Sequence, residues 1–217
     1  MLYSQVAGQE EIKESLIKSI NNNKVSHCYI FEGPKGMGKY QLALIFAQSL
    51  LCLNFLHDPC NTCKSCVKFN SFNHPDLHII NEDEKNIKRE EIDDLINSVY
   101  RKPYESKRKI YIIKAAESMT IQGANTFLKT LEEPPGDTVM LLLTTNSNLL
   151  LDTIVSRCQI IKFKNISKET IMQELEKYIT DKQIIELAAN YSNGILNKAI
   201  NIVRGEDNIL HQRQEII

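Results

Sequence analysis

The sequence predicts an α/β protein in which helices cover a five-stranded parallel sheet, followed by a small all-α part. Three observations predict this architecture. Short apolar stretches alternate with amphipathic ones up to residue 164, a glycine-rich loop separates the first strand from its helix, and only helical patterns follow residue 164. Alternation of strands and helices is typical of a parallel sheet that is buried on both faces.

The individual elements are predicted from hydrophobic periodicity. Buried strands are expected at residues 27–31, 76–80, 109–113, 139–143 and 159–163. In the first part, helices are expected to begin near Gly8 and to span 42–53, 92–99 and 120–131. In the second part they span 167–179, 181–191 and 195–203. Thr120 is the expected N-cap of its helix, which Pro134 and Pro135 end.

The change of pattern near residue 164 predicts the domain organisation. We place a first domain at 1–164, a small helical domain at 165–208 and the start of a further helix at 209–217. The small domain has about 50 residues, which is few for independent folding. We therefore expect it to pack on the first domain.

Composition argues against two classes of protein. The 217 residues carry a net charge of −1, which disfavours a strongly basic nucleic-acid binder but leaves room for a local basic patch. No apolar run approaches the roughly 20 residues of a membrane span, and the first residues lack the features of a signal peptide. We therefore expect a cytoplasmic protein without a membrane partner, whose 6 cysteines are not in structural disulfides.

The glycine-rich loop at residues 33–40 is a phosphate-binding pattern with one departure. It matches G-x-x-x-x-G-K-[ST] at every position but the last, where Tyr40 stands. In a working loop, backbone N–H groups and the lysine hold the phosphates, and the final hydroxyl coordinates Mg²⁺. Gly33, Gly36, Gly38 and Lys39 are therefore candidate phosphate-binding residues. Tyr40 cannot supply the short hydroxyl without moving the ion.

A second departure lies after the strand at 109–113. P-loop enzymes that hydrolyse nucleotides carry an Asp there that holds Mg²⁺ and often a Glu that polarises the attacking water. Here the two positions hold Lys114 and Ala115, and a lysine repels a divalent cation at close range. Glu117 is the alternative acid, but three extra residues are expected to carry it past the edge of the sheet. Hydrolysis is therefore not expected. ATP binding is expected to be weak or absent, and the loop could still hold a phosphate.

A cysteine cluster follows the helix after this loop. Its members are Cys52, Cys60, Cys63 and Cys66. Four closely spaced thiolates are the ligand set of a structural, tetrahedral Zn²⁺ site, and the metal would supply the folding energy of a hydrophilic insertion. An iron–sulfur cluster, a redox pair and unligated thiols are the alternatives.

The other cysteines and the nearby histidines are expected to have no metal role. Cys28 and Cys158 lie at strand ends, where buried and unreactive thiols are expected. His57 and His74 are spare donors beside the cluster, and solvated loop positions are expected for both.

Four segments resemble a known family. They are Val6-Ala7-Gly8-Gln9, His27-x-Tyr29-x-Phe31-x-Gly33, the stretch from Ala124-Asn125 to Leu131-Glu132-Glu133-Pro134-Pro135, and Ser156-Arg157-Cys158. These segments resemble the AAA+ subunits of the bacterial DNA polymerase III clamp loader, and the similarity extends over essentially the whole chain. The altered phosphate loop beside an intact Ser-Arg-Cys segment is similar to the delta-prime branch and not to the ATP-hydrolysing gamma/tau branch.

The resemblance implies an AAA+ domain with a zinc-binding insertion, a helical lid at 165–208 and a C-terminal helical collar that would start at 209–217. It implies gamma/tau and delta subunits as partners, and, through the assembled complex, the sliding clamp and primed DNA. The implied role is a subunit that supports clamp loading without an intrinsic ATPase. Because the assembled ring holds the DNA, a nearly neutral subunit is compatible with this role.

The resemblance also gives Arg157 a catalytic role in trans. In such assemblies the arginine of Ser-Arg-Cys reaches the nucleotide bound by the neighbouring subunit, as an arginine finger. The alternative is a surface arginine that pairs with a local carboxylate. Thr145 occupies a polar sensor position, whereas Asn197 stands where hydrolysing relatives carry an arginine in the lid. Lys198 is adjacent and could compensate.

Other interpretations remain open. One is an ATP-hydrolysing gamma/tau-type subunit with an unconventional metal site, and another is a zinc-bearing scaffold unrelated to replication. The basic stretch of Lys102, Lys107, Arg108 and Lys109 could meet DNA phosphates, but a solvated hairpin face is equally compatible with it. No ladder of aromatic residues for base stacking accompanies this stretch.

Overall fold

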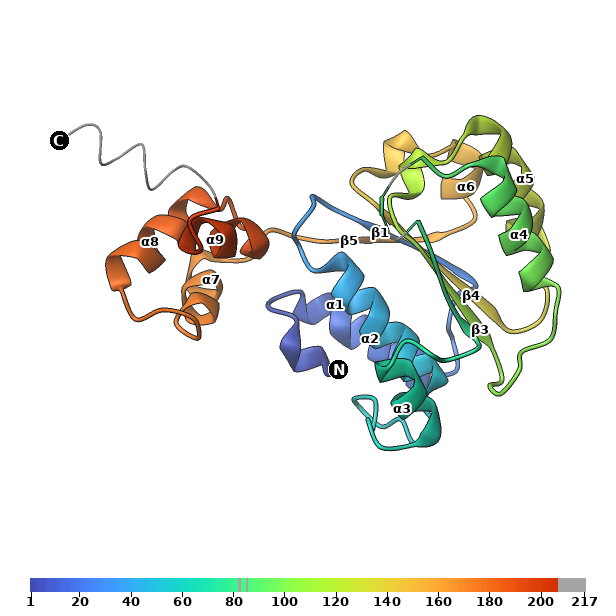
Figure 1. The fold of residues 1–217 in the computed structure, drawn as a ribbon, viewed down its shortest axis with the longest axis horizontal. Helices are drawn as coiled ribbons and strands as arrows, with labels where there is room; N and C mark the ends of the chain where they lie inside the picture. Colours follow the sequence, from blue (N-terminus) through green and yellow to red (C-terminus); the bar gives the residue numbers. More distant parts are fainter. Residues whose placement is uncertain (82, 85, 207–217) are drawn as a thin grey trace.

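A computed structural model describes residues 1–81, 83–84 and 86–206. Its first part is a layered α/β domain, and three helices follow it at one end of the molecule (Figure 1). The residues predicted to begin a further helix, 209–217, lie outside the described part of the chain.

In the described part of the chain, the sheet has five parallel strands, as the sequence predicts, and their order is β2-β3-β4-β1-β5. The strands are β1 (Cys28–Glu32), β2 (Leu77–Ile80), β3 (Lys109–Ile113), β4 (Thr138–Thr144) and β5 (Gln159–Lys162). β1 pairs with β4 on one side and with β5 on the other. β5 therefore forms an edge of the sheet, and its last residues lead to the C-terminal helices (Figure 1).

Helices cover both faces of this sheet (Figure 1). One face carries α1 (Glu10–Asn21), α2 (Lys39–Leu51) and α3 (Lys64–Asn70), and the other carries α4 (Arg89–Val99), α5 (Ile121–Glu132) and α6 (Asp152–Val155). Alternate side chains of a strand enter opposite layers, so Phe31 and Ile112 belong to the first core whereas Ile30 and Ile113 belong to the second. This alternation produces two apolar cores from one sheet.

Local sequence signals set the ends of several elements. The hydroxyl of Thr120 accepts a hydrogen bond from the N–H of Gly123 at 3.2 Å, which confirms the predicted N-cap of α5. Among the described residues, four short single-turn or 3-10 segments also occur: η1 (Tyr3–Gln5), η2 (Ala116–Ser118), η3 (Ser147–Leu149) and α6. The predicted helix at 42–53 begins earlier, at Lys39, because the phosphate loop leads directly into α2, and it ends before Cys52.

The C-terminal helices have a core of their own. They are α7 (Lys168–Leu175), α8 (Lys182–Tyr191) and α9 (Leu196–Val203), and Ile171, Leu175, Ile185 and Ile202 are buried among them. The turn before α9 lies against the connection from β5, where the N–H of Ile166 donates to the carbonyl of Gly194 at 2.9 Å.

Gly194 allows this close approach, and its replacement is our first prediction. Its φ is +79°, and an added Cβ would lie 2.5 Å from the Cβ of Asn165. We expect Gly194→Ala to lower the free energy of unfolding by about 1–2 kcal/mol for the left-handed backbone and by a further ~1–3 kcal/mol for overpacking, measured by urea unfolding with circular dichroism.

Gly205→Ala is the matched control for Gly194→Ala. Gly205 has a similar φ of +73°, but nothing lies within 4 Å of its added Cβ. Gly205→Ala should therefore lower the free energy of unfolding only by the cost of the left-handed backbone. Equal losses for the two variants would contradict the close packing at Gly194.

Candidate nucleotide cavity, arginine turn and cysteine cluster

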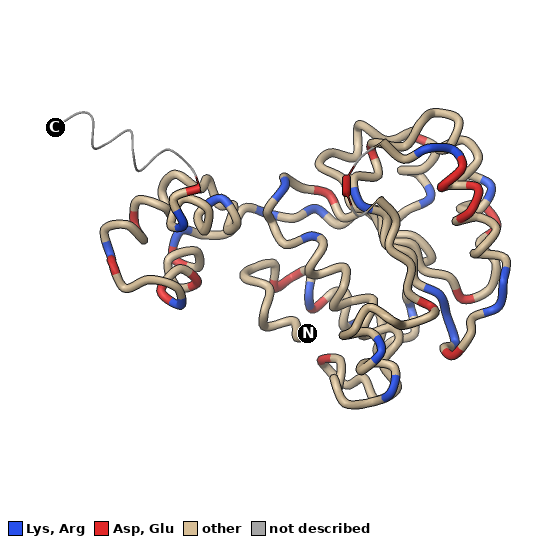
Figure 2. Tube along the Cα trace, in the orientation of Figure 1, with Lys and Arg blue, Asp and Glu red and all other residues tan. Residues whose placement is uncertain are grey.

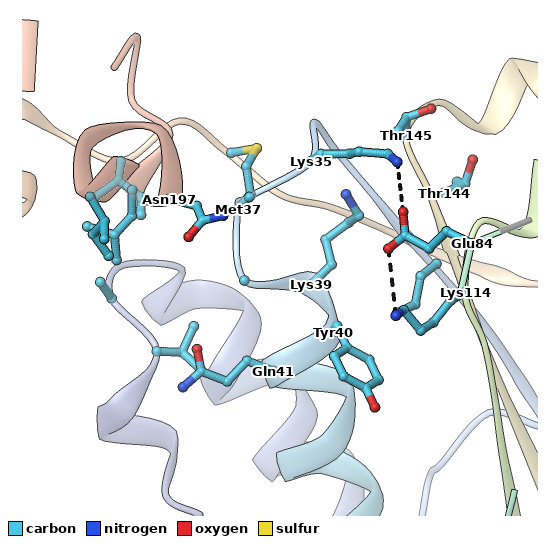
Figure 3. A pocket seen from close by; sticks show the side chains of 18 of the residues that line it. Lys35, Met37, Lys39, Tyr40, Gln41, Glu84, Lys114, Thr144, Thr145 and Asn197 are labelled. Carbon is cyan, nitrogen blue, oxygen red and sulfur yellow. Dashed lines mark hydrogen bonds and ion pairs between the residues drawn. The ribbon is translucent and has the colours of Figure 1, made fainter. Parts of the chain in front are cut away.

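The phosphate loop borders a cavity of about 640 Å³ at the carboxyl edge of the sheet, a volume in the range of small-molecule sites. The loop connects β1 to α2, and the N–H of Gly33 donates to the carbonyl of Thr144 in β4 at 3.2 Å. Gly36 and Gly38 have φ of +85° and +82°, a left-handed conformation that favours glycine. Of the predicted phosphate-binding residues, Gly36, Gly38 and Lys39 line this cavity, whereas Gly33 is not among the described residues that line it. Figure 3 shows Lys39 at this wall.

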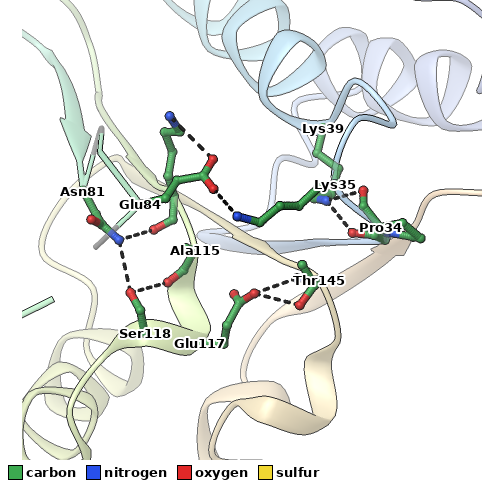
Figure 4. Close-up of polar contacts among 11 residues, drawn as sticks. Pro34, Lys35, Lys39, Asn81, Glu84, Ala115, Glu117, Ser118 and Thr145 are labelled. Atoms are coloured by element: carbon green, nitrogen blue, oxygen red, sulfur yellow. Dashed lines mark hydrogen bonds and ion pairs between the residues drawn. The ribbon is translucent and has the colours of Figure 1, made fainter. Parts of the chain in front are cut away.

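Lys39 bends back onto its own loop. Its Nζ donates to the carbonyl oxygens of Gly33 and Pro34, the latter at 2.8 Å (Figure 4). Burial lowers the pKa of Lys39 below its ordinary value. A phosphate that used Lys39 would have to take the ammonium group away from these carbonyls.

The two residues that replace magnesium ligands contact each other. The Nζ of Lys114 lies 4.8 Å from the centre of the Tyr40 ring, within the range of a cation–π interaction. Lys114 also lies 3.7 Å from a carboxylate oxygen of Glu84. A positive charge therefore stands on the side of the cavity where the pattern calls for metal ligands (Figure 3).

Glu84 joins this lysine to the phosphate loop, and sequence reasoning missed it. Its other carboxylate oxygen accepts a hydrogen bond from Lys35 of the loop at 2.7 Å (Figure 4). This hydrogen bond is the main cause that lowers the pKa of Glu84. The acidic run at 82–84 was the available signal, but its loop gives no indication of which side chain faces the cavity.

The prediction that Glu117 falls past the edge of the sheet is wrong. Ala115 adopts a left-handed conformation with φ of +47°, and the short helix η2 then returns Glu117 to the cavity. There its Oε1 accepts hydrogen bonds from the N–H of Thr145 at 3.1 Å and from its hydroxyl at 2.8 Å (Figure 4). Burial acts to raise the pKa of Glu117, but the hydrogen bonds outweigh it and the pKa is lowered. The expected sensor residue Thr145 is thus engaged by an internal carboxylate.

The small helical part closes one side of the cavity. The N–H of Asn197 donates to the carbonyl of Gly36 at 3.3 Å, and an added Cβ on Gly36 would lie 2.9 Å from the Cβ of Asn197. Asn197, expected in place of a lid arginine, therefore touches the phosphate loop. Lys198 is not among the described residues that line the cavity.

Arg157 follows α6 on the molecular surface, and its side chain is 35% exposed. Its guanidinium donates to Glu132 at 2.7 Å and to the carbonyl of Thr153 at 2.8 Å. In the chain by itself, the arginine therefore makes the local carboxylate pair that the sequence left open. Exposed ion pairs of this kind contribute only about 0–1 kcal/mol to stability, so a partner could take over the guanidinium at small cost.

The four clustered cysteines have the geometry of a metal site. Their sulfur atoms all lie within 4.8 Å of one another, and the sulfurs of Cys60 and Cys66 are 3.9 Å apart. A tetrahedron with Zn–S bonds near 2.3 Å has sulfur atoms about 3.8 Å apart, so the donor set fits zinc. Backbone N–H groups, first that of Thr62, lower the pKa of Cys60 to about 6, which favours the thiolate that a metal requires.

The prediction of a solvated loop position holds for His57, which is exposed, and is wrong for His74. His74 is buried, its Nε2 lies 3.0 Å from the hydroxyl of Ser65, and its Nδ1 accepts the N–H of Asp76. Burial lowers its pKa. His74 is thus a neutral core residue that ties α3 to the start of β2.

The prediction for the remaining two cysteines is also wrong. Cys28 and Cys158 are joined in a disulfide, with their Cα atoms 4.7 Å apart. Tyr29 pairs with Gln159 across β1 and β5, so the residues just before them, Cys28 at the start of β1 and Cys158 before the start of β5, are neighbours. A separation of 130 residues conceals this proximity in the sequence.

One lysine of the basic stretch does not reach the surface. Lys109 is buried, and its Nζ donates to the carbonyl of Ser98 at 2.7 Å. Figure 2 shows basic and acidic positions interspersed over the described chain. None of the described helices has the length and apolar character to cross a bilayer.

Known proteins resemble the chain over most of its length. The sequence model of a family described as "DNA polymerase III, delta subunit" matches residues 8–167. The DNA polymerase III subunit delta' of Bacillus subtilis is 36% identical over 95% of this chain and 66% of its own length. The gamma/tau subunit of Mycoplasma pneumoniae is 34% identical over 93% of this chain and 30% of its own length. The chain thus spans only part of both relatives.

Solved structures support the fold. The Holliday junction branch migration motor RuvB of Thermotoga maritima superposes with a TM-score of 0.62 at 17% identity, covering 97% of this chain and 66% of that one. A gamma subunit-related protein of Thermotoga maritima gives 0.51 at 22% identity, covering 85% and 58%. At such identities the likeness concerns the P-loop AAA+ fold alone.

Metal content is our second prediction, from the geometry of the cysteine cluster. We expect about one zinc ion per purified chain, measured by elemental mass spectrometry, and a large loss of zinc in Cys63→Ser. Cys28→Ser is the matched control because Cys28 is outside the cluster, and it should retain the metal. Bound iron with visible absorption would instead indicate an iron–sulfur cluster.

Proposed function

Because the chain belongs to the DNA polymerase III delta-subunit family of clamp-loader proteins, we propose that it acts as a delta-prime-type subunit that does not hydrolyse ATP. In this role it supports a neighbouring ATPase subunit while the sliding clamp is loaded onto primed DNA. The observation that carries the proposal is the contact between Tyr40 and Lys114, which puts an ammonium group where a hydrolase holds Mg²⁺.

The other polar groups of the cavity support this role. Lys39 is bonded to loop carbonyls, Glu84 is engaged by Lys35, and Glu117 by Thr145. Each group that could act on a triphosphate already has an internal partner. Binding of ATP would therefore be weak or absent. Hydrolysis would lack the metal, although Oε2 of Glu117 is buried without a hydrogen-bond partner among the described residues.

Arg157 would be the active contribution of this subunit. A planar guanidinium on the surface can be supplied to charge that develops on a phosphoryl group in an adjacent subunit. Its present partner, Glu132, comes from the Leu-Glu-Glu-Pro-Pro segment. Exchange of this carboxylate for a phosphate would need no change in the buried core.

The partners and domains follow from the same proposal. A gamma/tau subunit would bind at the Arg157 surface and a delta subunit elsewhere in the ring, and the assembled cytoplasmic complex would contact the clamp and the DNA. Residues 1–164 would be the AAA+ domain with structural Zn²⁺ at the cysteine cluster, and 165–208 the lid. A collar would begin at 209–217.

An ATP-hydrolysing gamma/tau-type subunit is the second candidate. Two observations favour it. Gamma/tau relatives are identical to this chain at about a third of the aligned positions, and Glu117 reaches the cavity. The scaffold unrelated to replication is excluded by the family match. Magnesium dependence separates the two remaining candidates.

Nucleotide titration of the isolated chain is our third prediction. We expect Mg²⁺ to change the affinity for ATP by less than about threefold, because Lys114 repels a second cation, as measured by calorimetry with Mg²⁺ or with EDTA. A gamma/tau subunit of the same source, measured in parallel, serves as the positive control. Tight binding that requires Mg²⁺ would favour the second candidate.

Removal of the guanidinium is our fourth prediction. In the reconstituted complex, Arg157→Ala should slow hydrolysis at the adjoining site by about 10³-fold, the lower end of the contribution of an arginine finger, and so lower the DNA-stimulated ATPase. The change is on the surface, so circular dichroism should show an intact fold. Arg101→Ala, another exposed arginine, is the control and should not alter turnover. An unaltered rate with Arg157→Ala would refute this role.

A further inference from the structure

We propose that Cys28 and Cys158 form a reversible thiol–disulfide pair that controls how firmly the turn carrying Arg157 is fixed to the sheet. The inference deepens the proposed function, because the turn matters for activity only if Arg157 serves a neighbour. Its chemical part, the reversible pair and its effect on the turn, can be tested without any partner.

The fold itself brings the two sulfur atoms together. Tyr29 pairs with Gln159 and Ile30 with Ile160 in the parallel ladder of β1 and β5, so Cys28 and Cys158 occupy the next matched positions. Their Cα atoms are 4.7 Å apart, which is the ordinary spacing of neighbouring strands, about 4.8 Å. A disulfide accepts Cα separations of about 4.4–6.8 Å. The bond can therefore form or open without any movement of the strands.

The bond links the arginine turn to the centre of the sheet. Within the turn, Arg157 and Cys158 donate their N–H groups to Ile154 and Val155, which are local contacts. β1 is a central strand and β5 an edge strand. The disulfide is thus a direct covalent link between the residue next to Arg157 and a buried residue at the start of a central strand.

When the bond opens, weaker contacts hold the turn. Ile154 remains in the core, and Arg157 keeps its exposed pair with Glu132. Apolar packing, local hydrogen bonds and one exposed ion pair restrain a turn less than the same contacts together with a covalent link do. Reduction should therefore increase the motion of residues 152–158 and leave the remaining strands unchanged.

The two sulfur atoms differ in their exposure to solvent, and this difference decides which of them an external thiolate attacks. Cys28 is fully buried, whereas Cys158 is only partly buried. A thiolate of low molecular weight, such as glutathione, attacks the sulfur of Cys158 and forms a mixed disulfide, and the electron pair of the broken bond leaves on the sulfur of Cys28, which takes up a proton. A second glutathione attacks the glutathione sulfur of that mixed disulfide and releases the Cys158 thiolate. One protein disulfide and two thiols become two protein thiols and one glutathione disulfide, and the reverse reaction oxidises the pair.

The proposed compartment favours a reversible function over a permanent staple. Disulfides of cytosolic proteins are usually transient and redox-sensing. The metal-site cysteines are a separate set. They lie in the insertion beside α3, which packs on the first core, whereas Cys28 belongs to the second core on the other face of the sheet. Bound zinc would keep their thiolates out of the exchange.

The test uses the zinc-loaded chain equilibrated in buffers of graded reduced and oxidised glutathione. Alkylation and mass spectrometry should show two thiols that appear together in one transition, and Cys28→Ala and Cys158→Ser should abolish it. Hydrogen exchange should be at least threefold faster at residues 152–158 in the reduced chain. Both variants should show the fast rate in every buffer, whereas amides of β4 should not change. The absence of a transition, or equal exchange in the two states, would overturn the proposal.

A second arm tests the link to activity and separates the two proposals. In the reconstituted complex, the DNA-stimulated ATPase should differ at least threefold between oxidising and reducing buffers, and the difference should vanish when the subunit carries Cys28→Ala. If Arg157→Ala lowers turnover but the redox state has no effect, control of Arg157 by the disulfide is overturned. If Arg157→Ala has no effect while the exchange difference remains, the proposed function fails and the redox pair stands.

Discussion

An ammonium group against an aromatic ring organises the cavity at the carboxyl edge of the sheet. The ammonium group of Lys114 lies over the ring of Tyr40, and a positive charge at this place disfavours a nearby divalent ion because like charges repel. The carboxylate of Glu84 forms ion pairs with both Lys114 and Lys35. It thus supplies these two cations with the negative charge that a phosphate would otherwise bring. The bonds of Lys39 to its loop and of Glu117 to Thr145 complete a cavity whose polar groups are largely satisfied without a ligand.

Sequence reasoning succeeds where a short segment determines its own structure. The alternation of apolar stretches predicts all five strands, and Thr120 marks the start of α5 because its hydroxyl caps the next turn. It fails where position depends on contacts between distant segments. The return of Glu117 depends on the left-handed Ala115, and the pairing of Cys28 with Cys158 depends on the place of β5 beside β1. Neither follows from periodicity, since strand order and single backbone dihedrals leave no mark on an apolar pattern.

The cysteine insertion also has a structural link to the cavity. Its Asp58 accepts the N–H of Tyr3 at 2.7 Å, and Tyr3 is buried, with Ser49 of α2 donating to its hydroxyl at 3.2 Å. Burial raises the pKa of this phenol far above its ordinary value, so the group stays neutral. The chain then continues to Val6 and Ala7, which line the cavity. A metal that orders the insertion would therefore also order one wall of the cavity, which gives the insertion a structural purpose within the AAA+ fold.

The contrast between the interior and the surface is consistent with the proposed division of roles. Inside the cavity, Lys39 donates to two loop carbonyls, and Lys114 contacts the Tyr40 ring and Glu84. An added ligand that used these cations would have to break such contacts. At the surface, Arg157 has one exposed carboxylate partner, and such a pair costs little to exchange. A buried pair would have bound the guanidinium too firmly, because separating buried charges leaves one of them uncompensated. The same chain can thus keep its own phosphate site closed and still offer a mobile charge to an adjoining subunit, and the cysteine pair next to Arg157 is placed where it can limit that mobility.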